Sequence, residues 1–192
     1  MVSEAMLPRA AVREVEQRLT AAGGPDADFD ARELFRLATG RAVRLSDRPL
    51  TAEQAAALEV LCTRRAAREP LHYLCGSGSC LDFELAVGPG VLCPRADTEV
   101  VAQAAAETLA GIASPRVLDL CAGTGCLGLG VKRFCPAAQV TSVEKSPAAF
   151  AYLEKNARCA LPGQGRQPEN VLEPTALEQA TAPTFDWGPA LH

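Results

Sequence analysis

The stretch that most constrains how this chain can fold lies between Arg116 and Phe134. Residues 116–120, Arg-Val-Leu-Asp-Leu, form a short apolar run that predicts a buried strand. A glycine-rich turn follows at residues 121–125, and residues 127–134 predict a helix. In α/β proteins this order of strand, glycine turn and helix holds ligands that contain adenosine, because a turn without Cβ atoms lets the ligand approach the backbone. We therefore expect a ligand site at this turn.

A second strand and an acidic residue follow at the spacing that such a site requires. Residues 138–144 alternate well enough between apolar and polar side chains to predict a strand, and that strand ends at Glu144. Glu144 lies nineteen residues after Gly125, about where these folds place the carboxylate that accepts hydrogen bonds from ribose hydroxyls.

Two classes of ligand fit the glycine turn. Gly123-x-Gly125-x-x-Gly128 satisfies the dinucleotide fingerprint as a string, but that string has low specificity. Asp119 favours S-adenosylmethionine (SAM) instead, because SAM methyltransferases place an acid at the end of the first strand, where it can face the amino group of the methionine moiety. An ordinary turn with a solvated acid is the third interpretation. We favour SAM and keep the other two open.

Composition and charge exclude several classes of protein. The chain has 192 residues, enough for one large or two small domains, and 48% of them are hydrophobic, which allows a real core. The net charge of -4 argues against a general binder of nucleic acid or anionic membranes. No apolar run approaches the roughly 20 residues of a membrane span, and charged residues interrupt the first twenty positions, so no signal peptide is expected. We expect a cytoplasmic protein with no membrane or direct nucleic-acid partner.

The cysteines do not predict a metal site. None of the eight forms a Cys-x-x-Cys pair, and the chain has only two histidines. In a reducing cytosol they are expected to be mostly small buried hydrophobic side chains. They are Cys62, Cys75, Cys80, Cys93, Cys121, Cys126, Cys135 and Cys159.

The first 70 residues predict helices only. Apolar residues at helical spacing and capping signals predict three helices, at residues 8–22, 31–39 and 51–68. Asp28 or Asp30 is expected to cap the second helix, and Thr51 with Gln54 forms a capping box for the third. Helices of this number and length suit a small bundle that recognises or packs on something else.

The next segment predicts a β-hairpin that links the helices to the α/β part. Its strand-like segments, which glycine-rich turns separate, lie at residues 73–75, 81–87 and 91–93. The first of these turns is Gly76-Ser77-Gly78-Ser79. Asp97 or Thr98 is then expected to cap a helix at residues 99–109.

Three strings, in this order and spacing, resemble one known family. They are Glu69-Pro70-Leu71-x-Tyr73, the run Val87 to Glu99 that contains Pro94-Arg95-x-Asp97-Thr98-Glu99, and Asp119-Leu120-Cys121-Ala122-Gly123-Thr124-Gly125. The chain resembles the HemK/PrmC family, the peptide chain release factor N5-glutamine methyltransferases. The Pro-Arg-x-Asp-Thr-Glu string is far more diagnostic than the glycine turn, and the resemblance covers about residues 8 to 160.

The resemblance implies a fold and a cofactor. The fold class is α/β: a small helical bundle for substrate recognition at residues 1–70, a β-hairpin linker at 71–94 and an incomplete Rossmann-like class I SAM-methyltransferase domain at 95–192. Family members often carry Asp where this chain has Glu144, and either carboxylate can accept from ribose. The cofactor positions expected for SAM are Asp119, Cys121, Ala122, Gly123, Thr124, Gly125 and Glu144.

The resemblance also implies a protein substrate, and it shows where this sequence differs from the family pattern. The implied substrate is the glutamine of the Gly-Gly-Gln motif of peptide chain release factors, and the implied complete enzyme is a monomer. Asn170 is only a loose match for the acid that the family often places beside the adenine. Phe185-Asp186 looks like the start of the fourth strand, after which the family continues into Asn-Pro-Pro-Tyr. This sequence reads Trp187-Gly188-Pro189 and reaches His192 without that motif.

The missing motif matters chemically. A carboxamide nitrogen is a poor nucleophile because its lone pair is delocalised into the carbonyl, and Asn-Pro-Pro-Tyr orients this nitrogen by hydrogen bonds. We therefore assign no catalytic residue and no metal ligand, and expect a truncated, inactive copy of the enzyme. A non-catalytic module that binds SAM or a partner stays open as the alternative. An NAD-dependent oxidoreductase is disfavoured by Asp119 and by the Pro-Arg-x-Asp-Thr-Glu string.

Overall fold

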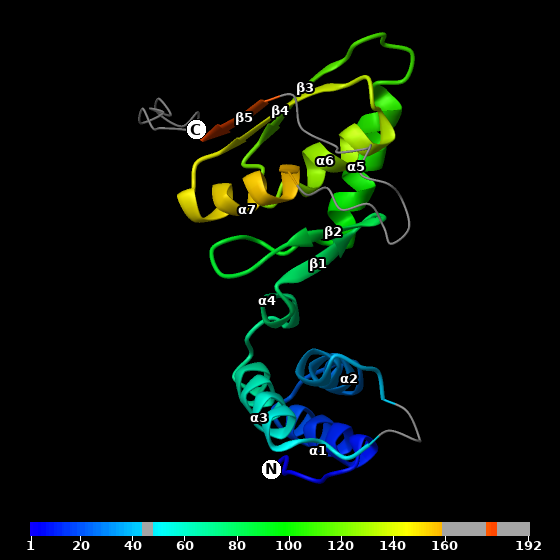
Figure 1. Cartoon of the computed structure of the whole chain (residues 1–192). Helices are drawn as coiled ribbons and strands as arrows, with labels where there is room; N and C mark the ends of the chain where they lie inside the picture. Colours follow the sequence, from blue (N-terminus) through cyan, green and yellow to red (C-terminus); the bar gives the residue numbers. More distant parts are fainter. Residues whose placement is uncertain (44–47, 159–175, 180–192) are drawn as a thin grey trace, which may run out of the picture. The chain divides into compact units, whose positions relative to one another are not determined.

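The computed structural model describes residues 1–43, 48–158 and 176–179. The chain forms two compact units, Met1–Cys75 and Gly76–His192. The first unit is helical, and the second combines a two-stranded and a three-stranded sheet with helices (Figure 1). The division falls after Cys75, so that the strands of the β-hairpin lie within the second unit. In the described ranges no helix has the length and apolar character that a membrane span needs.

The helical unit is built from three main helices and a short fourth. These are α1 (Pro8–Ala21), α2 (Ala27–Thr39), α3 (Ala52–Ala66) and α4 (Leu71–Cys75). The predicted capping box of α3 is confirmed, because Thr51 Oγ1 accepts from the Gln54 N–H while Gln54 Oε1 accepts from the Thr51 N–H, both at 3.2 Å. Gly40 ends α2 with a φ of 71°, the left-handed conformation that glycine adopts freely.

The core of this unit forms where the apolar faces of the three long helices meet. Leu34, Phe35 and Leu58 are fully buried there. The same interior holds an ion pair between Asp30 Oδ2 and Arg65 Nε at 2.8 Å. The prediction that Asp28 or Asp30 caps the second helix is wrong, because both residues lie inside it. Helix α2 begins four residues earlier, at Ala27, and its N-cap residue Asp26 makes no side-chain capping bond.

The hairpin differs from the sequence prediction. Strand β1 (Ser77–Cys80) pairs antiparallel with β2 (Phe83–Ala86), so the Gly-Ser-Gly-Ser segment predicted as a turn supplies most of a strand. The turn is formed by Leu81 and Asp82, and Leu81 takes a φ of 55°. Its N–H donates to Glu99 Oε1 at 3.0 Å, and its side chain packs against the hairpin core, which offsets the strain.

Two other predicted strand segments are wrong. Residues 73–75 belong to α4, because the Pro70 carbonyl accepts from the N–H groups of Tyr73 and Leu74 and so starts a helical turn. Residues 91–93 form no strand. Helix α5 (Ala96–Thr108) begins three residues before the predicted start, and its N-cap is Arg95 instead of Asp97 or Thr98.

The α/β part contains the predicted strand, turn and helix. Strand β3 (Arg116–Leu120) is followed by α6 (Cys126–Phe134), β4 (Gln139–Glu144) and α7 (Pro147–Arg158). The sheet order is β3-β4-β5, and both pairings are parallel, with β5 at Ala176–Gln179. Asn170, the loose match for the acid beside the adenine, and Phe185-Asp186, the expected start of the fourth strand, lie outside the described residues.

The two faces of this sheet have different environments. Asp119, Val140 and Ser142 are buried on the face that α6 and α7 cover (Figure 1). On the other face Leu118 and Leu120 are 61% and 64% exposed. Strand β3 also has a free edge within the described part of the chain, since its only strand partner there is β4. Parallel sheets are normally covered on both faces, so this face and edge suit further packing.

Candidate functional site

The glycine loop lies at the carboxyl end of β3 and takes an unusual backbone path. Cys121, Gly123 and Gly125 all have positive φ, at 59°, 58° and 82°. The Gly125 N–H donates to the Ala122 carbonyl at 2.8 Å, and the Ala122 N–H donates to the Val143 carbonyl at 3.0 Å. These bonds tighten the loop and attach it to the end of β4.

Glu144 meets the loop at the end of β4, as the sequence predicted. Its Oε2 accepts from the Gly123 N–H at 2.9 Å, and its Oε1 accepts from the Ser146 N–H at 2.8 Å. The side chain is largely buried, with 9% of the residue exposed. Each carboxylate oxygen has two lone pairs, so both oxygens keep acceptor capacity for ligand hydroxyls.

Asp119 points into the protein beneath α6. Its Oδ2 accepts from the Gly128 N–H at 3.0 Å, and its carboxylate is also hydrogen-bonded to the Ser142 hydroxyl. Burial raises the pKa of Asp119, and these two hydrogen bonds oppose that rise. Asp119 thus anchors the first turn of α6 to the sheet. Its contact with the amino group of a ligand stays a prediction.

Gly123 and Gly125 of the loop and Gly128 of α6 have different surroundings. A Cβ on Gly125 would lie 2.7 Å from Leu153 Cδ1, and one on Gly128 would lie 2.8 Å from Asp119 Oδ2, so both positions are needed for packing. A Cβ on Gly123 would meet no atom closer than Val91 Cγ2 at 3.8 Å. The space above the loop backbone is therefore at Gly123, next to the Glu144 carboxylate.

The segment between β2 and α5 supplies a wall that the sequence analysis missed. Val91 is 4% exposed, and its side chain is the nearest neighbour of the space at Gly123. Gly90 lies against Ala148, since a Cβ there would be 2.9 Å from the Ala148 Cβ. The available signal was Gly88-Pro89-Gly90, a string whose composition by itself indicates only a turn.

Asn156 is a second residue that the sequence analysis did not assign to the site. It lies on α7, is 2% exposed and hydrogen-bonds both to β2 and to the Thr124 carbonyl of the glycine loop. The available signal was a polar residue on the apolar face of α7, beside Leu153 and Ala157.

The cysteines depart in part from the expectation of free buried side chains. Cys80 of β1 and Cys126 of α6 form a disulfide across 46 residues of sequence. Cys62 and Cys93 are free and buried, and burial raises the pKa of both thiols, which fits inert core positions. Cys121 is exposed in the glycine loop. Within the described residues no group of three or more histidines, cysteines or acids could hold a metal ion.

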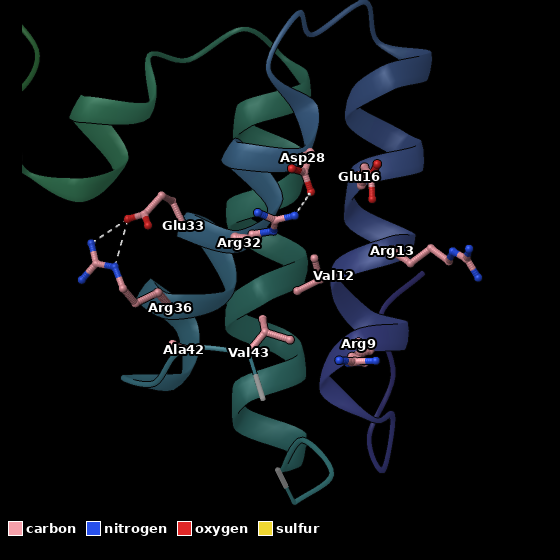
Figure 2. A pocket seen from close by; sticks show the side chains of 10 residues that line it. All are labelled: Arg9, Val12, Arg13, Glu16, Asp28, Arg32, Glu33, Arg36, Ala42 and Val43. Carbon is pink, nitrogen blue, oxygen red and sulfur yellow. Dashed lines mark hydrogen bonds and ion pairs between the residues drawn. The ribbon is translucent and has the colours of Figure 1, made fainter. Parts of the chain in front are cut away.

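The helical unit has a separate hollow of about 640 Å³ between α1 and α2. Figure 2 shows Val12 and Val43 between the two helices, while the side chains of Arg13 and Arg36 point away from them. Arg32 pairs with Asp28 at 2.7 Å and Arg36 with Glu33 at 2.8 Å. The described residues that line this hollow are Arg9, Val12, Arg13, Glu16, Asp28, Arg32, Glu33, Arg36, Ala42 and Val43. It contains no glycine turn or ribose-binding acid, so we assign it no cofactor.

Comparison with known proteins matches both units. Residues 10–76 match the family model for the PrmC N-terminal domain, and residues 83–181 match the methyltransferase small domain. The chain is 38% identical over 183 residues to the release factor glutamine methyltransferase of Bifidobacterium longum, covering 91% of this chain and 61% of that protein. It is 41% identical over 111 residues to the enzyme of the same name from Geobacter sulfurreducens, covering 58% and 38%.

This chain therefore spans about two fifths to three fifths of the length of those relatives. Among solved structures, coclaurine N-methyltransferase matches at 22% identity over 91% of this chain and 49% of its own, but the TM-score of 0.35 is too low to carry an argument. The two family models together cover most of the residues that carry the motifs. The chain thus belongs to the methyltransferase small domain family, and its PrmC N-terminal domain makes it a member of the HemK/PrmC family that its motifs had predicted.

Proposed function

We propose that the α/β unit binds SAM at the glycine loop, with the methionine moiety above Gly123 and the ribose hydroxyls on Glu144. The observation that carries this proposal is the Gly123 N–H to Glu144 hydrogen bond at 2.9 Å, beside a backbone position with open space. Cys121, Ala122, Thr124 and Gly125 complete the proposed loop contacts. SAM would supply an electrophilic methyl group, and the residues of this chain would bind and orient it.

The position of Asp119 favours SAM over a dinucleotide. A pyrophosphate binds helix N-termini through free N–H groups and the positive end of the helix dipole. Here the Gly128 N–H in the first turn of α6 already donates to Asp119. A carboxylate in that position disfavours a second anion and favours a cationic sulfonium.

We further propose that the substrate is the side-chain amide of a glutamine in a release factor, as the names of the relatives state for those proteins. Transfer to such a nitrogen requires a group that orients the amide and exposes its lone pair. The 192 residues contain no Asn-Pro-Pro-Tyr. We propose that residues 1–192 bind SAM and a partner, and that efficient methyl transfer additionally needs that segment.

The hollow between α1 and α2 is our proposed docking surface for the release factor. Arg9 and Arg13 on α1 have exposed side chains and no ion-pair partner in the described part of the chain. Arg32 and Arg36 are already paired with Asp28 and Glu33. Arg9 and Arg13 would therefore supply the attraction for an acidic segment of the partner, mainly by accelerating association. The apolar floor at Val12 would add buried area.

The test compares residues 1–192 with a version extended by a relative's C-terminal part that carries Asn-Pro-Pro-Tyr. Both receive labelled SAM and a release factor, and a release factor with Gln→Ala in its Gly-Gly-Gln motif is the control. The extended protein is expected to transfer methyl at least about tenfold faster, equivalent to about 1.4 kcal/mol of barrier. Equal rates would overturn the role assigned to the added segment. If the extended protein binds SAM and stays inactive, the chain is a binding module.

A further inference from the structure

Asn156 joins three segments that lie far apart in the sequence. From its position on α7, its Oδ1 accepts from the Ala86 N–H at 2.7 Å, at the end of β2. Its Nδ2 donates to the Ala86 carbonyl at 3.1 Å and to the Thr124 carbonyl at 2.9 Å. Both amide hydrogens and one acceptor site of the carboxamide are thus used, in a residue that is 2% exposed.

The bond to Thr124 acts at the most constrained point of the glycine loop. Thr124 is 3% exposed and stands between Gly123 and Gly125, both in the left-handed region. A buried carbonyl without a donor is unfavourable, so loss of the Asn156 bond favours a rotated Thr124 peptide. Such a rotation changes ψ at Thr124 and φ at Gly125, and it moves the Gly125 N–H away from the Ala122 carbonyl, the bond that tightens the loop around Gly123.

Three apolar contacts also join these segments, and they do not fix a peptide's direction. Val91 lies beside Gly123, Ala148 lies beside Gly90, and Leu153 fills the space at Gly125. Apolar contacts are non-directional, whereas a carboxamide that donates and accepts on one backbone residue sets both distance and angle. Among the described contacts with the Thr124 carbonyl, Asn156 supplies the side-chain hydrogen bond.

We propose that Asn156 is a positioning residue for the cofactor site. It holds the Thr124–Gly125 peptide so that the Gly125 N–H stays on the Ala122 carbonyl. The loop then keeps the path that places the Gly123 N–H on Glu144 and leaves the space above Gly123 open, and Asn156 does not itself contact the ligand. This inference rests on the proposed binding of SAM. It makes the hairpin part of the cofactor site, because the same carboxamide fixes the end of β2.

The test uses Asn156→Asp and Asn156→Ala. The first keeps the shape and the acceptor for the Ala86 N–H and loses both donated bonds, and the second loses all three. Val131→Ala is the control, because Val131 is 1% exposed and packs in a different cluster, with Ala138 and Val140. SAM affinity is measured by calorimetry and loop exposure by hydrogen exchange, at a temperature where circular dichroism shows every variant folded.

Both Asn156 variants are expected to raise the Kd for SAM about tenfold, the factor that corresponds to one lost buried hydrogen bond. The amides of Gly123 and Gly125 should exchange faster while those of β4 keep their protection, and Val131→Ala should leave the Kd within about twofold. A Kd within that range for Asn156→Asp would overturn the inference. If wild type fails to bind SAM, the proposed function fails by itself. Unchanged exchange at Gly123 and Gly125 in both variants would then refute the positioning role separately.

Discussion

Substituting alanine at Gly123 and at Gly125 should separate the binding of SAM from the stability of the fold. Both glycines have positive φ, at 58° and 82°, so a Cβ at either one costs about 1–2 kcal/mol of backbone strain. They differ in their surroundings. The added Cβ at Gly125 would lie 2.7 Å from Leu153 Cδ1, whereas at Gly123 the nearest atom is 3.8 Å away.

These distances predict different magnitudes. Gly125→Ala adds an overpacking cost of about 1–3 kcal/mol to the strain, so the α/β unit should lose about 2–5 kcal/mol of stability. Gly123→Ala should lose only the strain, about 1–2 kcal/mol. Its methyl group occupies the space proposed for the methionine moiety, so the Kd for SAM should rise about 10- to 100-fold, from a steric cost of similar size.

The assay combines hydrogen exchange of the slowest β4 amides, which reports the stability of the α/β unit, with calorimetric titration of SAM. Gly111→Ala is the matched control, because Gly111 has a φ of 85° and an added Cβ there would have nothing within 4 Å. Gly111→Ala should lose stability through backbone strain alone and should leave the Kd for SAM unchanged. The reasoning is refuted if Gly123→Ala binds SAM as tightly as Gly111→Ala does, or if Gly125→Ala is no less stable than Gly123→Ala.

Three further predictions concern stability. Asp119→Asn should keep the hydrogen bond from the Gly128 N–H. Because burial raises the pKa of Asp119 in the folded state, the wild-type carboxyl contributes most stability below its unfolded pKa, and this contribution is lost as the pH rises through the folded pKa. In denaturant titrations the variant should therefore become more stable relative to wild type as the pH rises. Asp30→Ala leaves Arg65 without its carboxylate partner and should cost the helical unit about 2–3 kcal/mol, with little further loss when Arg65→Ala is added. Cys80→Ser should cost the oxidised α/β unit about 2–4 kcal/mol and leave the fully reduced protein nearly unchanged; equal losses in both redox states would contradict the disulfide.

Local sequence signals predicted the parts of the fold in which one pattern dominates. The strand at 116–120 and the capping box at Thr51 both appear in the structure as expected. Glu144 was placed beside the loop from spacing alone, and it hydrogen-bonds to Gly123. These features depend on neighbours in the sequence or on the fixed geometry of a β-α-β unit, and for that reason a single sequence reveals them.

The errors occurred where distant contacts override local preference. Gly-Ser-Gly-Ser has the composition of a turn, yet Gly78 and Cys80 are buried in a strand that a disulfide joins to Cys126, 46 residues away. Asp30 is a residue type that commonly caps helices, but here it is buried and accepts a hydrogen bond from Arg65, thirty-five residues away. The role of Asn156 depends on two backbone carbonyls that no local pattern connects.

The central claim is that the glycine loop and Glu144 form a site for SAM, and calorimetric titration of residues 1–192 tests it most directly. SAM, S-adenosylhomocysteine and NAD are titrated separately into wild type and into Glu144→Gln, which keeps an acceptor oxygen and loses the charge. The account predicts that SAM and S-adenosylhomocysteine bind to wild type, that Glu144→Gln weakens both about tenfold through the ribose contact, and that NAD shows no binding. Tight binding of NAD with no binding of SAM would contradict the account.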